Sequence, residues 1–110
     1  MKIRFLLSLL FLVSFLPVSL AEGEKTIQTA IKDQKFVPDE IHVKADQPVK
    51  LQVTNEDSIP VEFESPDLNK EKMIPPGKTV DIHLWGLTPG VYEFFSDFGP
   101  KDLRGKIVVE

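Results

Sequence analysis

Cysteine is absent from this chain of 110 residues. The protein therefore has no disulfide bonds, although small exported domains often depend on them for stability. The fold must instead obtain its stability from a hydrophobic core of adequate size. An antiparallel β-sandwich rich in Val, Ile and Phe is one way to build such a core.

Long hydrophobic runs are also scarce. The one long apolar run covers residues 5–16 and follows the basic residues Lys2 and Arg4. It is too short for a membrane-spanning helix. A basic start, an apolar run and small residues that end at Ala21 are typical of a secretory signal peptide. We therefore predict that residues 1–21 are a signal peptide cleaved after Ala21, and that the protein is periplasmic or secreted, without direct membrane insertion.

Positive charge is the third scarce feature. The chain has 13 Lys and Arg residues against 17 Asp and Glu residues. Without Lys2 and Arg4, the predicted domain of residues 22–110 has 11 basic and 17 acidic residues, which is a formal charge of −6. This balance disfavours nucleic acid and anionic membranes as partners. It is compatible with the attraction of metal cations or of a basic protein surface.

Apolar and polar residues alternate with a period of two through most of residues 22–110. Such alternation between Pro- and Gly-containing turns predicts an all-β sandwich of about seven or eight short strands. The polar stretch 66–72 is predicted to form at most one turn of helix. The predicted strands lie around residues 27–31, 41–43, 49–53, 61–63, 80–84, 92–94 and 106–109.

Two segments of this pattern resemble the cupredoxins, the family of small sandwiches that hold blue copper. The first segment is residues 55–63, where an Asn ends a strand and Pro60 follows. The second is Pro89-Gly-Val-Tyr-Glu-Phe-Phe-Ser96, and it is followed by the Gly-Lys-Ile strand that begins at Gly105. The resemblance covers nearly all of residues 22–110 and implies a cupredoxin-like Greek-key β-sandwich.

The resemblance also indicates where copper ligands would lie. In the family, a His, a Cys, a second His and a Met bind the metal, and the corresponding positions here are Val61, Ser96, Gly99 and Leu103. A serine hydroxyl cannot replace the thiolate that defines a type 1 copper site. Strand parity directs Val61 and Ser96 inward, so we predict a small apolar plug and no type 1 copper.

Several further motifs resemble a narrower group of periplasmic cupredoxin-like proteins that occurs with bacterial high-affinity iron permeases. These motifs are Phe36-x-Pro38, Phe63-Glu-Ser65, residues 68–72 and residues 92–95. The resemblance implies an accessory role in iron or copper handling, with a membrane iron permease or its periplasmic components as the partner. The alternative is a metal-free protein-interaction module. An enzyme is less favoured, because no nucleophilic or acid–base arrangement is recognisable.

Carboxylates on outward faces of the predicted strands form a candidate metal site. Glu62 and Glu64 project from one side of their strand, and Asp97 and Glu93 lie on the outward face of a neighbouring one. If Glu62, Glu64 and Asp97 lie close together, they make an oxygen-rich site for iron or another divalent cation. The alternative is a solvated acidic surface.

The remaining metal-binding and aromatic residues favour structural roles. His42 and His83 alternate with apolar neighbours and are predicted to face solvent. Met73 has a soft sulfur, but we expect it to cover the edge of the core. Trp85 and the pair 94–95 are predicted to contribute core and edge packing.

Overall fold

A computed structural model describes residues 23–98 and 103–110, so the predicted signal peptide and Gly99 lie outside the described residues. In the described part every regular element is a β-strand, and the strands number nine rather than the predicted seven or eight. They are β1 (Lys25–Lys32), β2 (Lys35–Val37), β3 (Glu40–Val43), β4 (Val49–Asn55), β5 (Val61–Ser65), β6 (Lys70–Ile74), β7 (Thr79–Leu84), β8 (Gly90–Phe95) and β9 (Arg104–Val109).

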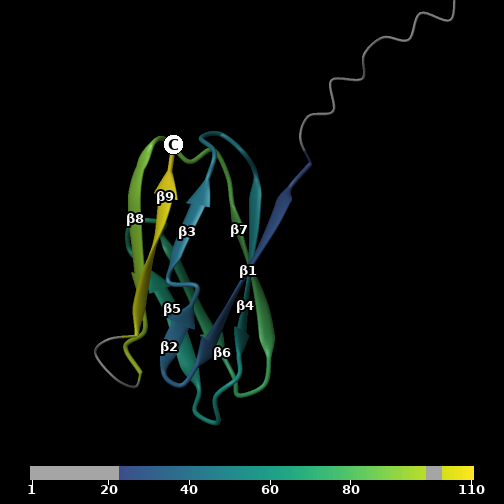
Figure 1. Ribbon diagram of the computed structural model, residues 1–110, viewed down its shortest axis with the longest axis vertical. Coiled ribbons are helices and arrows are strands. Elements are labelled where there is room, and N and C mark those ends of the chain that lie inside the picture. Colours follow the sequence, from purple (N-terminus) through teal and green to yellow (C-terminus); the bar gives the residue numbers. More distant parts are fainter. Residues whose placement is uncertain (1–22, 99–102) are drawn as a thin grey trace, which may run out of the picture.

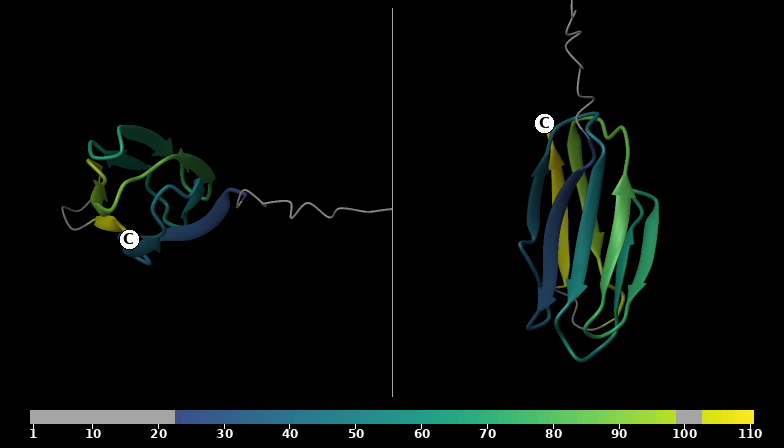
Figure 2. Two further views of the ribbon diagram at one scale, coloured as in Figure 1. Left: turned by 90° about the horizontal axis from the view of Figure 1, so that it is seen from above. Right: turned by 90° about the vertical axis from the view of Figure 1, so that its right-hand side faces the viewer.

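The strands form two sheets that face one another, with the orders β2-β1-β4-β7 and β3-β9-β8-β5-β6 (Figures 1 and 2). The pairs β1–β4 and β3–β9 are parallel, and the other pairs are antiparallel. The predicted all-β sandwich is therefore confirmed. No helix in the described residues is long and apolar enough to cross a membrane.

The core between the sheets is aromatic at its centre. Phe36, Phe63 and Phe94 are at most 3% exposed. The rings of Phe63 and Phe94 stack with their centroids 4.9 Å apart, and Phe36 meets Phe94 edge-on at the same separation. Each of these pairs contributes about 0.5–1.5 kcal/mol beyond the burial of its apolar area. The core thus supplies stability in a domain that has no disulfide bonds.

Two strands, β2 and β6, were not predicted from the sequence, and β6 is the one that bears on the site. The sequence predicts at most one helical turn in the polar stretch 66–72, and this prediction is wrong. Asn69 has a φ of 54° in a turn. The chain then enters β6, which pairs antiparallel with β5. Because β6 is an edge strand with four exposed residues out of five, it lacks the apolar alternation that marks a strand in sequence.

Two side chains lie elsewhere than predicted. Trp85 is 67% exposed and does not take part in core packing. Met73 is 49% exposed and does not cover the core edge, because its neighbour Ile74 occupies the inward position of β6. Phe94, in contrast, is completely buried as expected.

Candidate metal site

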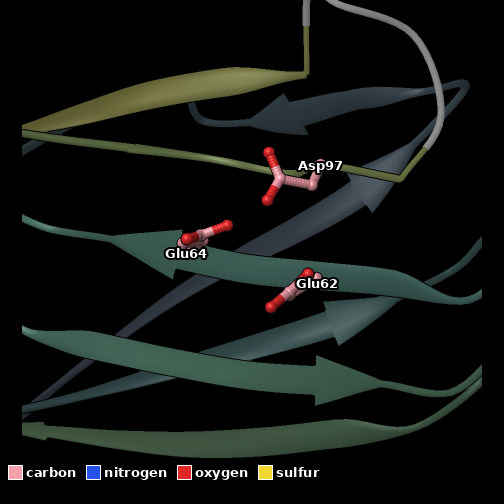
Figure 3. Close-up of side chains that lie close together, drawn as sticks. All are labelled: Glu62, Glu64 and Asp97. Atoms are coloured by element: carbon pink, nitrogen blue, oxygen red, sulfur yellow. The ribbon is translucent and has the colours of Figure 1, made fainter.

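The acidic residues lie on the outer face of the five-stranded sheet. In β5 the side chains of Val61, Phe63 and Ser65 are buried on the inner side. Alternation along the strand then directs Glu62 and Glu64 to the outer side. Asp97 follows the neighbouring strand β8, and Figure 3 shows its side chain on the same side of the sheet as both glutamates.

The structure brings the three predicted residues together. Glu62, Glu64 and Asp97 each offer one carboxylate oxygen, and these three oxygens all lie within 4.8 Å of one another. Glu62 is buried, Glu64 is half-buried and Asp97 is exposed. A group of this size can surround a single cation, and its exposed side leaves a path for the ion to enter.

Ser96 fixes the position of this acidic group. Its hydroxyl accepts a hydrogen bond of 3.1 Å from the backbone N–H of Glu62 and donates one of 2.9 Å to the carbonyl oxygen of Phe98. The buried serine therefore ties β5 to the segment that carries Asp97. The hydroxyl that the resemblance places at the thiolate position thus has a structural role here.

Within residues 23–98 and 103–110 the acidic group has no basic partner. None of the ion pairs in the described part of the chain involves Glu62, Glu64 or Asp97. Oε2 of Glu64 is shielded from solvent and receives no hydrogen bond from a described donor. The negative charges are thus balanced neither by lysine nor by arginine among these residues.

The crowding of carboxyl groups changes their acidity. The neighbouring carboxyl of Asp97, together with burial and the charges of Glu62 and Glu71, raises the pKa of Glu64 to about 7. The pKa of Glu62 is also raised, first by the adjacent carboxyl of Glu71 and then by burial and Asp97. Both pKa values rise because carboxyl groups that lie close together and partly away from water favour the protonated form.

Glu71 was missed by the sequence reasoning. It lies directly opposite Glu64 in the β5–β6 pair, and its carboxyl is within hydrogen-bonding reach of that of Glu62. Recognition of β6 as a strand would have revealed it, because paired residues share a face of the sheet. Glu93 lies outside the group. The β8–β9 register places it opposite Lys106, and it lines a separate groove together with Glu40.

Three of the four positions that the resemblance assigns to copper ligands, Val61, Ser96 and Leu103, lie in the described part of the chain, and all three are buried. Val61 is 4% exposed and Leu103 is 2% exposed. Ser96 is also buried, but its side chain is polar and makes the hydrogen bonds described above. Since the chain has no cysteine, it has no type 1 copper site.

The two histidines do not form a second metal site. His42 on β3 lies 3.0 Å from Glu40, and His83 on β7 lies 2.7 Å from Glu24. Both side chains are about half exposed, as predicted, at 58% and 48%. The two residues belong to different sheets and do not converge.

The sandwich of a four-stranded and a five-stranded β-sheet is a cupredoxin-like fold. The family described as cupredoxin-like domain matches residues 4–109, and the chain belongs to this family. A curated relative, the uncharacterized protein RP394 of Rickettsia prowazekii, is 36% identical over 115 residues, which cover 98% of this chain and 92% of the relative.

Solved structures share the fold at low sequence identity. The blue copper protein auracyanin A of Chloroflexus aurantiacus has a TM-score of 0.69 and 16% identity, and the match covers 80% of this chain and all of that one. The metal-binding domain of the Cu(I)-exporting ATPase CopA of Streptococcus pneumoniae has a TM-score of 0.72 and 15% identity, with coverages of 81% and 88%. These similarities establish the fold alone.

Proposed function

We propose that the protein is a periplasmic cupredoxin-like accessory protein that binds a hard divalent cation, with iron as its main cargo. The observation that carries this proposal is the group of Glu62, Glu64 and Asp97, whose oxygens converge without a basic partner among the described residues. Carboxylates so placed are stabilised by a metal ion, which supplies the positive charge that the protein lacks.

The ligand chemistry favours a particular class of ion. Carboxylate oxygens are hard donors and suit ions such as Mn²⁺, Ca²⁺ and iron, whereas Cu(I) prefers sulfur. Met73 offers the one sulfur atom in the described part of the chain, and it pairs with Glu62 across the β5–β6 ladder. Copper is therefore the less favoured cargo, and it would depend on Met73.

The cellular role follows from the resemblance to proteins that occur with iron permeases. A soluble exported domain with an exposed cation site is suited to receive iron in the periplasm and to deliver it to a membrane iron permease or its periplasmic components. The signal peptide predicted for residues 1–21 supports this location. The acidic character of residues 22–110 would favour a partner with a basic face.

Calorimetric titration of the mature protein tests the proposal. Ferrous iron under anaerobic conditions, Mn²⁺ and Cu²⁺ are added separately to the parent and to a variant that combines Glu62→Gln with Asp97→Asn. We expect one hard cation to bind the parent, and binding to be lost in the variant while the far-ultraviolet circular dichroism is unchanged. Equal binding by both proteins, or no binding by the parent, would contradict the site.

A metal-free interaction module is the second candidate function, and one feature favours it. Ile59 and Phe98 are 51% and 48% exposed, and both line one groove at the apolar end of the sandwich. Exposed apolar side chains that gather in this way mark protein contact surfaces. If this is the main function, Ile59→Ser should abolish binding to the permease components, and Glu62→Gln should leave that binding unchanged.

A further inference from the structure

The outer face of the five-stranded sheet holds a fourth carboxyl group beside the three of the proposed site. Glu71 projects from β6, where the strand register places it opposite Glu64. Its carboxyl reaches that of Glu62, while the carboxyl of Glu64 reaches that of Asp97. Two carboxyl–carboxyl contacts thus lie side by side and draw on β5, β6 and the segment after β8.

The burial of Glu62 shows that the cluster is more than a solvated acidic surface. This residue is only 7% exposed, yet in the described part of the chain its carboxylate receives no hydrogen bond from an N–H group and no ion pair. Oε2 of Glu64 is likewise covered and lacks a donor. Buried carboxylates are normally paired. The buried Glu62 and the covered Oε2 of the half-buried Glu64 lie instead among other carboxyls, which a cation can bridge.

We infer that Glu71 is the fourth ligand of this site and that the resulting set of four carboxylates selects hard cations by charge, with trivalent ions held more tightly than divalent ones. The inference rests on the proposed function, because it concerns the same site. Met73 carries the one sulfur atom in the described part of the chain, and its side chain is half exposed. Carboxylates are hard donors that bind mainly through their charge, so ionic charge is the property to which a site of four carboxylates responds most strongly.

The expected size of the effect follows from Coulomb's law. The attraction between a carboxylate and an ion is proportional to the charge of the ion, so the loss of one carboxylate costs a trivalent ion 1.5 times as much free energy as a divalent one. If Glu71→Gln weakens Mn²⁺ binding about 10-fold, it should weaken Tb³⁺ binding about 30-fold, since affinity depends exponentially on free energy.

Glu93 provides a matched control. It lies on the same outer face, on β8, but the strand register places it opposite Lys106, and it does not act on the pKa of Glu62 or Glu64. Glu93→Gln therefore removes the same charge from the same sheet without removing a ligand. The side chains of Glu71 and Glu93 are both exposed, so neither substitution affects the core.

The experiment is a calorimetric titration of the parent, Glu71→Gln and Glu93→Gln with Mn²⁺ and with Tb³⁺ at the same ionic strength. We expect Tb³⁺ to bind the parent more tightly than Mn²⁺, Glu71→Gln to weaken both with the larger loss for Tb³⁺, and Glu93→Gln to stay within about twofold of the parent.

Three results overturn the inference in distinguishable ways. If Glu71→Gln behaves like Glu93→Gln while the parent binds both ions, Glu71 is not a ligand and the three-carboxylate site of the proposed function stands. If Glu71→Gln weakens both ions by the same factor, the site does not select by charge. If the parent binds neither ion, both the inference and the proposed function are wrong.

Discussion

The raised pKa of Glu64 leads to a quantitative expectation for the pH dependence of metal binding. A cation binds the ionised carboxylate, so protons compete with it. With a pKa of about 7, Glu64 is mostly ionised at pH 8 and only about 3% ionised at pH 5.5. Glu64 alone should therefore weaken binding about 30-fold between these pH values, whereas a carboxyl with an ordinary pKa would weaken it by about 10%.

The assay is a set of Mn²⁺ titrations at half-unit steps from pH 8 to pH 5.5. Glu64→Gln serves as the control, because it removes the titrating group whose ionisation dominates this range. We expect its affinity to be lower than that of the parent at pH 8 and to change far less as the pH falls. A parent whose affinity stays constant down to pH 5.5 would refute the reasoning and would show that the three carboxylates do not crowd one another in solution.

Three further outcomes are expected. In metal-free protein the folded state holds a proton on Glu64 that the unfolded state releases, so the free energy of unfolding in urea should fall as the pH rises from about 4.5 to about 7, and Glu64→Gln should flatten this slope. Gly105→Ala should destabilise the fold by about 1–3 kcal/mol in the same assay at constant pH. The added Cβ would lie 2.5 Å from the Phe94 ring and 2.6 Å from the carbonyl oxygen of Asp39. Finally, Cu²⁺ should produce no intense absorption at about 600 nm, since that band of blue sites needs a thiolate.

Much of the fold could be predicted from alternation alone. Phe63 and Phe94 are buried in the core as expected. Glu64 follows Phe63 in the same strand and therefore directs its carboxylate to the outer side, because successive side chains of a strand face opposite sides. The closed apolar end at Val61 and Leu103 was also anticipated. These residues are constrained by strong local signals, namely large apolar side chains at a period of two.

The missed features depend on contacts between distant segments. β6 is an exposed edge strand whose stability comes from its pairing with β5, so its own residues carry no apolar pattern. Glu71 was overlooked for the same reason. Trp85 is a large apolar residue that sequence reasoning assigns to packing, yet it is 67% exposed after the end of β7. The proximity of Asp97 to Glu62 similarly depends on the packing of β8 against β5.

A crystal structure of the protein loaded with Mn²⁺, with anomalous scattering recorded near the manganese edge, tests the central claim most directly. We expect one strong anomalous peak between the carboxylates of Glu62, Glu64 and Asp97, with metal–oxygen distances of about 2.0–2.6 Å. A peak beside His42 or His83, or no peak at saturating Mn²⁺, would contradict it.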